Sequence, residues 1–175
     1  PVKCPEIIDL YHSEYHGVKG LRNGLAESLD SRQQWFGAYR NAARTLEAKQ
    51  RAGLPVTDLQ RVEQEVTAAF TSDYRAFTEH QTVLLRFDTL EVMQHESDAV
   101  QKLCNLGQEE LGVRAWLMAL LPELPNTLIL GASRPPLAFL PDRSQIPFKE
   151  YMLDQLDSDA TKQYVQSLAD QESGL

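Results

Sequence analysis

The chain of 175 residues contains little cysteine and no long apolar run. Its two cysteines, Cys4 and Cys104, lie far apart and form no CxxC pair. We therefore expect reduced thiols and a cytoplasmic protein rather than a disulfide framework, with a cytoskeletal, organellar or nuclear assembly as the alternative. No run of about 18 apolar residues is present, so we expect no membrane insertion. Pro1 is the expected start after removal of an initiator methionine, and a cleaved presequence is the other explanation.

Positive charge is also scarce. Seventeen Lys and Arg residues stand against 25 Asp and Glu residues, which gives a net charge of −8. Only residues 1–53 are mildly basic, with eight Lys and Arg against six Asp and Glu. Broad phosphate binding needs clustered cations, so the composition argues against nucleic-acid binding. Within the basic third, Arg32, Arg40 and Arg44 are the residues that could contact an acidic partner.

The residue patterns that carry catalysis are missing as well. His12 and His16 are four residues apart and could present two nitrogen atoms to one metal ion. Glu14 is out of place for an HExxH motif, and no Glu-x-x-His pair of the di-iron kind is present. Glycine spacings of the GxGxxG and GxSxG types are absent too. We predict that the chain is not an enzyme and uses no cofactor; the alternative, a small helical metalloprotein, depends on His12 and His16.

The sequence does contain helical periodicity. Residues 5–16 have the spacing of a short amphipathic helix, and the glycines that follow interrupt it. A long helix is predicted from residue 21 or 25 to residue 51, because its apolar residues lie three and four apart if Arg32 fills one seam position. Gly53 and Pro55 then provide the expected stop signal.

Two further long helices are predicted after that stop. Thr57 and Gln60 form a capping box that begins a helix over residues 57–87. Asp88 and Glu91 could form a second capping box at a tight turn, which we favour over one continuous rod. The third helix then runs over residues 88–121 and ends at a proline.

Prolines dominate the next segment, residues 122–147. Six of the nine prolines lie there, and few helices survive that density. The segment is also apolar, unlike a disordered linker. We therefore expect an extended arm that packs either on its own bundle or on a partner. Residues 148–171 return to helical spacing.

These patterns together predict an all-α fold. We expect an elongated, antiparallel, coiled-coil-like three-helix bundle with a Pro-rich extended arm and a short C-terminal helix. The predicted parts are a short N-terminal helix or arm (1–20), the bundle (21–121), the arm (122–147) and the C-terminal helical segment (148–175).

A family resemblance concerns residues 25–121, just over half of the chain. The stretch Glu65-Val66-Thr67-x-Ala69-Phe70 follows the Gly53 turn, and Leu103, Leu106, Glu109, Glu110 and Leu111 come later. With the Arg- and Gln-rich first helix, this outline resembles the "required for excision" B-type domain. The Phe-Pro-x-Tyr entry to the second helix of that family is missing here. The resemblance implies a nuclear, helical accessory protein linked to DNA repair, without catalytic residues.

Our functional prediction is a structural or adaptor subunit that binds other proteins within a larger intracellular assembly. Apolar side chains among helix-breaking residues need a surface to cover them, and Trp is enriched at protein interfaces. The DNA-repair accessory factor is the alternative. The predicted partner-binding residues are Leu128, Ile129, Leu130, Leu137, Phe139, Leu140, Trp35 and Trp116.

Overall fold

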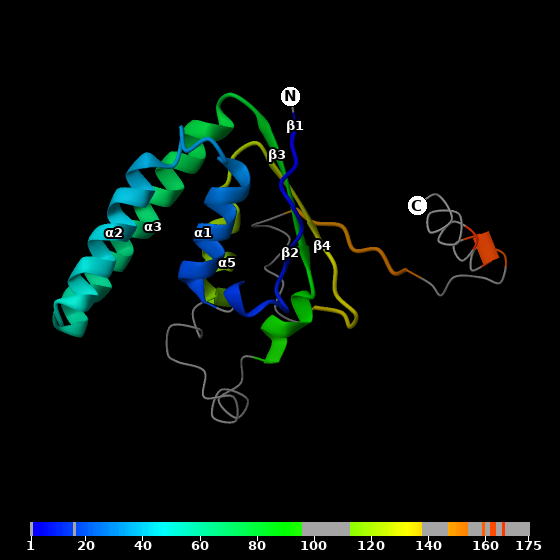
Figure 1. The fold of residues 1–175 in the computed structure, drawn as a ribbon. Helices are drawn as coiled ribbons and strands as arrows, with labels where there is room; N and C mark the ends of the chain where they lie inside the picture. The colour runs from blue at the N-terminus through cyan, green and yellow to red at the C-terminus, as the bar shows by residue number, and fades with distance from the viewer. Residues whose placement is uncertain are drawn as a thin grey trace.

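The structure is a computed structural model that describes residues 2–15, 17–95, 113–137 and 147–153, together with the single residues 159, 162, 163 and 166. Its helices are α1 (Val18–Leu29), α2 (Gly37–Arg51), α3 (Val56–Thr78) and α5 (Val113–Leu120), with short 3-10 helices η1 (Ser13–Tyr15), η2 (Leu90–His95) and η4 (Leu121–Glu123). Its strands are β1 (Val2–Lys3), β2 (Ile8–Asp9), β3 (Thr82–Asp88) and β4 (Thr127–Gly131). The chain therefore has an α/β fold (Figure 1).

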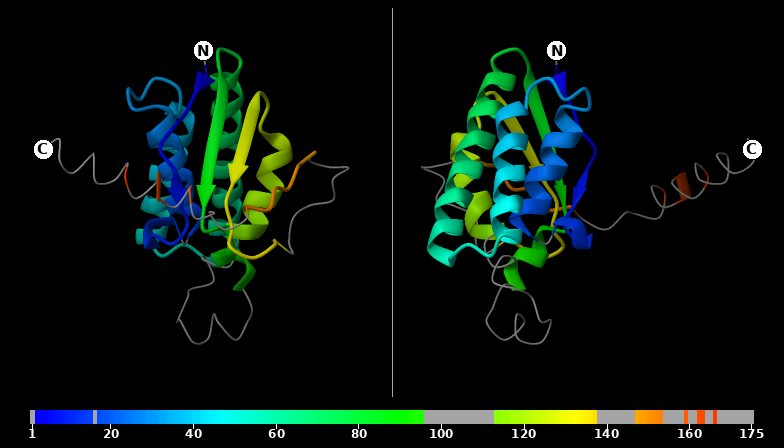
Figure 2. Two further views of the ribbon diagram at one scale, coloured as in Figure 1. Left: turned by 90° about the vertical axis from the view of Figure 1, so that its right-hand side faces the viewer. Right: turned by 60° about the vertical axis from the view of Figure 1, so that its left-hand side comes forward.

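All the strands of the sheet run parallel, and β3 is its centre. The short strands β1 and β2 follow one another along one edge of β3, and β4 pairs with the other edge. Helices α1 to α3 connect β2 to β3, and α5 precedes β4. Both connections pass behind the sheet in the left view of Figure 2, which makes both crossovers right-handed, as parallel connections almost always are.

One extra residue separates β1 from β2. Val2 lies opposite Thr82, whereas Ile8 lies opposite Phe87, so this edge strand has one residue more than β3 over the same length. Pro5 lies within the interruption and has no N–H to donate to the ladder. Its carbonyl oxygen instead accepts a hydrogen bond of 2.7 Å from the Arg86 guanidinium. The bulge therefore fixes the Arg86 side chain of the central strand.

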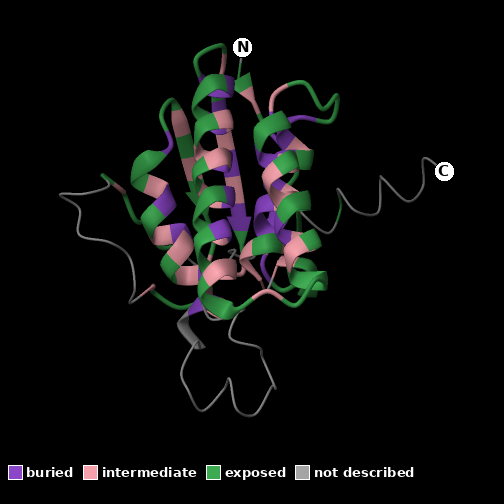
Figure 3. Ribbon diagram, turned by 90° about the vertical axis from the view of Figure 1, so that its left-hand side faces the viewer, coloured by how far each residue is buried: buried purple, intermediate pink, exposed green. Residues whose placement is uncertain are grey.

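Helices α1, α2, α3 and α5 lie on one face of the sheet (Figures 1 and 2). Viewed from that side, buried and exposed residues alternate along each helix, as expected for helices with one covered stripe (Figure 3). The centre of the core is aromatic: Phe70 lies 5.5 Å from Phe36, 5.3 Å from Tyr39 and 6.0 Å from Trp116 between ring centroids. The fully buried Phe70 therefore joins α2, α3 and α5.

Two polar contacts fix α3 to its neighbours. Arg22 of α1 is 1% exposed, donates to the Thr67 hydroxyl over 2.9 Å and pairs with Glu63 at 2.6 Å. The Tyr74 hydroxyl lies 2.8 Å from the Thr127 hydroxyl of β4, and burial raises the pKa of Tyr74 to about 12. Tyr74 therefore stays neutral and able to hydrogen-bond across the physiological pH range.

The predicted all-α, coiled-coil-like three-helix bundle is wrong. Helix α3 ends at Thr78 instead of continuing to Phe87, and a polar turn leads into β3. The β3 residues alternate strictly between covered and less covered positions, which is the period of a strand. Leu84 and Phe87 are three residues apart, which also fits the apolar stripe of a helix. The spacing of apolar residues alone therefore could not distinguish a helix from a strand in this short run.

The other predicted elements are corrected in the same way. The expected helix over residues 5–16 is replaced by β2 and η1, and the first long helix is interrupted between Leu29 and Gly37. The Thr57 capping box does not form, because α3 begins at Val56 with Pro55 before it and no side-chain cap. Within the predicted arm, Thr127–Gly131 is a strand of the sheet rather than a segment laid on a bundle.

A close approach at Gly20 generates the first prediction. Gly20 lies inside α1, and a Cβ atom there would overlap the carbonyl oxygen of Glu14 in η1, the segment packed on this helix. Replacing Gly20 with Ala should therefore lower the free energy of unfolding by about 1–3 kcal/mol, because backbone must move. The matched control is Gly37→Ala, where nothing lies within 4 Å of the new atom. Ala should stabilise that helical position by up to about 1 kcal/mol. Urea denaturation of the two variants measures both effects, and equal behaviour would contradict the packing of η1 on α1.

Candidate protein-binding face

The face of the sheet opposite the helices is the candidate functional site. Side chains alternate along a strand, and Val83, Leu85 and Phe87 of β3 point into the helix-covered core. The intervening residues of β3 and their register partners therefore point to the other side. We call this surface the open face and define it by the following residues: Val2, Thr82, Leu84, Arg86, Leu128 and Leu130.

The open face is apolar and largely exposed. Leu128 and Leu130 of β4 are 65% and 60% exposed, and Val2 of β1 is 67% exposed. Leu84 lies between them on the central strand, opposite Leu128, and is half-buried. Adjacent strands in a sheet lie about 4.8 Å apart, so these side chains form one continuous patch. Helices α1, α2, α3 and α5 all lie on the other side of the sheet (Figure 1).

Arg86 places one cation within this patch. It lies opposite Leu130, and its guanidinium donates to the Pro5 carbonyl. Its Nε atom is buried and has no hydrogen-bond partner, and no carboxylate of a described residue forms an ion pair with it. A half-buried guanidinium without a counter-charge is costly, so the open face would bind a carboxylate at this position favourably.

The structure separates the predicted partner-binding residues into groups. Leu128 and Leu130 are on the open face, whereas Ile129 between them points to the core, and Leu137 also packs against the core. Phe139 and Leu140 lie outside the described residues.

The two tryptophans belong to the core rather than to the open face. Trp35 is partly buried and lies 6.0 Å from Phe77 and 4.9 Å from His80 between ring centroids. Trp116 of α5 packs on Phe70, and its buried indole N–H has no hydrogen-bond partner. Neither ring lies with the open-face residues, since both belong to the helical side of the sheet.

The three predicted arginines of the first third do not form a basic surface together. Arg32 and Arg44 are exposed, but Arg40 pairs with the buried Asp30 at 3.2 Å. Asp30 also accepts hydrogen bonds from the backbone N–H groups of Gln34, Trp35 and Phe36, over 2.8 to 3.1 Å. The loop between α1 and α2 therefore winds around the Asp30 carboxylate. Because Arg40 is paired with this carboxylate, its charge does not add to a basic surface.

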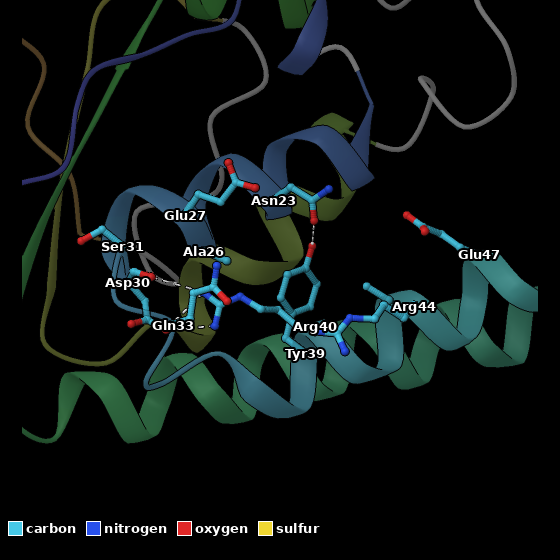
Figure 4. A pocket seen from close by; sticks show the side chains of 11 residues that line it. Asn23, Ala26, Glu27, Asp30, Ser31, Gln33, Tyr39, Arg40, Arg44 and Glu47 are labelled. Atoms are coloured by element: carbon cyan, nitrogen blue, oxygen red, sulfur yellow. Dashed lines mark hydrogen bonds and ion pairs between the residues drawn. The ribbon is translucent and has the colours of Figure 1, made fainter.

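A polar cleft of about 350 Å³ lies beside this ion pair, between α1 and α2 (Figure 4). The Tyr39 hydroxyl donates to the Asn23 side chain within it. Burial raises the pKa of Tyr39 to about 12, against a smaller opposing effect of Arg22. Glu27 and Glu47 also line the cleft, and Glu47 pairs with Lys19 at 2.9 Å. The cleft thus has mixed charge and largely satisfied side chains, unlike a site built for one ligand.

The carboxyl ends of β2 and β3 hold the other polar cluster. Asp9 accepts hydrogen bonds from the Thr89 hydroxyl over 2.7 Å and from the backbone N–H of Tyr11 over 3.0 Å. Both bonds lower the pKa of Asp9, the Tyr11 bond most strongly. His12 lies 3.7 Å from Asp9, while His16 is outside the described residues. No group of three metal-ligating side chains occurs in the described part of the chain. The cluster joins two strand ends.

Comparison with protein-family models, with curated proteins and with solved structures finds no match to this chain. The Glu65–Phe70 stretch that carries the resemblance lies in α3, where Val66 and Phe70 are buried in the core. The resemblance itself stays a prediction. No helix among the described residues is long and apolar enough to cross a membrane.

Sequence reasoning missed Val2, Leu84 and Arg86 as members of the open face. The signal was present in residues 82–88, where apolar residues at odd positions alternate with Thr82, Leu84 and Arg86. A strand interpretation of that run would have placed Arg86 on the face opposite the core.

The Asp30 contacts generate a prediction about pH. Burial alone would raise the pKa of Asp30, but the three backbone N–H groups and Arg40 outweigh burial and lower it. The ionised carboxylate therefore stabilises the fold above the ordinary Asp pKa, and this contribution is lost as the pH falls through the lowered value. Asp30→Ala should cost about 3–5 kcal/mol at pH 7, because Arg40 loses its partner. As the pH is lowered from neutral through the ordinary Asp pKa and below it, Asp30→Asn should lose less stability than the wild type. Chemical denaturation across that range measures both; a wild-type pH dependence retained in Asp30→Asn would contradict the role of this carboxylate.

Proposed function

We propose that this protein is a non-enzymatic structural or adaptor subunit that binds another protein through its open face. The observation that carries the proposal is the exposure of Leu128 and Leu130 beside Leu84 on a parallel sheet. Parallel sheets are almost always covered on both faces, because their crossover helices usually lie on both sides. Here helices α1, α2, α3 and α5 lie on the other side of the sheet (Figure 1), so a second surface is needed to remove these apolar side chains from water.

The composition of the open face supports a protein as the binding partner. Protein interfaces combine an apolar centre with a few buried polar groups, and Arg is enriched among them. Leu84, Leu128 and Leu130 supply the apolar centre, and Arg86 supplies the single charge. Flat, apolar surfaces of this kind suit another protein better than a small molecule, which binds in a concave pocket.

The intracellular location remains part of the proposal. It depends on the two cysteines, of which Cys4 is exposed and unpaired. The exposed apolar side chains of the open face are also the reason for proposing that the protein is a subunit of a larger assembly.

Polar substitutions on the open face test the proposal. The double change Leu128→Ser and Leu130→Ser removes apolar area from exposed positions, so the melting temperature should change little. Proteins that co-purify with the tagged wild type under native conditions should be depleted about tenfold or more with this variant. Quantitative mass spectrometry of the co-purified material measures the depletion.

Val56→Ser is the matched control, since Val56 is 70% exposed at the start of α3, on the helical side of the sheet. It should leave the co-purifying set unchanged. If the double variant also keeps the full set while remaining folded, the open face is not a protein-binding surface and the proposal fails.

A further inference from the structure

We infer that the open face of one copy of this chain binds residues 147–153 of a second copy, so that two chains associate by exchanging these segments. The inference rests on the proposed function, because it names the partner of the open face. We call residues 147–153 the tail segment.

The tail segment also exposes large apolar side chains. Tyr151, Met152 and Leu153 are 70%, 81% and 94% exposed, and they follow one another without helix or strand. Three consecutive large apolar side chains in water are a strong indication of a binding segment or of association. One chain thus presents two uncovered apolar surfaces, which can shield each other.

The place and length of the tail segment suit this exchange. It leaves the molecule on the side of the sheet opposite the helices and runs outward, away from its own open face (Figure 1). It contains seven residues, as many as β3, so it can extend over about 23 Å and match the length of the central strand.

Charge supports the same pairing. Arg86 is the cation of the open face; its guanidinium donates to the Pro5 carbonyl and forms no ion pair with a carboxylate of a described residue. The tail segment carries one carboxylate, Glu150, directly before its apolar residues. The neighbouring Lys149 ammonium lies 4.7 Å from the centre of the Tyr151 ring. Glu150 forms no ion pair with another described residue, so it can pair with Arg86 of the second copy.

The structure favours a second copy over the chain's own tail. A tail joined to the same chain has a high effective concentration at its own open face, so an intramolecular fit would be favoured if the geometry allowed it. Instead, Leu128 and Leu130 of the open face and Leu153 of the tail segment are all exposed within one copy. Exchange between copies buries both surfaces.

A charge reversal tests the pairing in the full-length chain. Arg86→Glu and Glu150→Arg should each weaken self-association about tenfold or more, because like charges would meet at the interface. The double variant should restore the wild-type association, since its opposite charges are exchanged. Sedimentation velocity over a concentration series measures the dissociation constants, and circular dichroism verifies folding. A wild-type chain that is monomeric at all concentrations, or a double variant no better than the singles, overturns the inference.

Crosslinking distinguishes exchange from an intramolecular fit. In a background of Cys4→Ser and Cys104→Ser, one chain carries Leu130→Cys and a second chain carries Leu153→Cys. A short bismaleimide should join the two different chains, whereas the pair with Val56→Cys in place of Leu130→Cys should not react. When both cysteines are in one chain, a link only within that chain at every concentration overturns the inference.

These outcomes separate the inference from the proposed function. A monomeric chain whose co-purifying proteins depend on Leu128 and Leu130 would keep the protein-binding face and remove the exchange. A dimer linked through Leu153 with no other co-purifying protein would keep the exchange and limit the function to self-association.

Discussion

The central strand β3 has a parallel neighbour on each edge but helices on only one face, and most of the structure follows from this constraint. Its odd-numbered side chains, such as Leu85 and Phe87, fill the core between the sheet and the helices. Its even-numbered side chains point to the other face, so every apolar residue there adds exposed surface. In a two-layer α/β unit built in this way, helices cover the apolar side chains on one face of the sheet. Apolar side chains on the other face are exposed to water unless a second surface covers them.

Buried polar groups hold the covered layer together at the points where helices meet. Asp30 organises the loop between α1 and α2, and Arg22 connects α1 to α3 through Glu63 and Thr67. Such groups are costly to bury unless each finds its partners, so they specify one arrangement of the helices. Arg86 differs from them because its guanidinium donates to the Pro5 carbonyl and forms no ion pair with a carboxylate of a described residue. Asp30 and Arg22 of the helical layer each have an oppositely charged partner, whereas Arg86 of the open face has none among the described residues.

The sequence allowed the α2 and α3 helices to be predicted, but not the sheet. Gly53 with Pro55 marked the end of one helix and the start of the next within a few residues. The predicted first helix needed Arg32 at a position of the stripe that should be apolar, which was a sign that the helix is interrupted there. The structure places Arg32 in the loop around Asp30, between α1 and α2. The strands are short and pair with residues up to 80 positions away, as Val2 pairs with Thr82. No local pattern contains that information, because the stability of such a strand comes from its distant neighbours.

The site was predicted in part, for a reason that the structure revises. Leu128 and Leu130 were selected because apolar residues among prolines need a covering surface. That argument holds for these two side chains, but Ile129 between them packs against the core, which only the alternation of a strand explains. Prolines at 125 and 135 lie outside β4, where a missing N–H costs no ladder hydrogen bond. The same prolines that excluded a helix therefore permit a strand, and that strand presents every second residue to a partner.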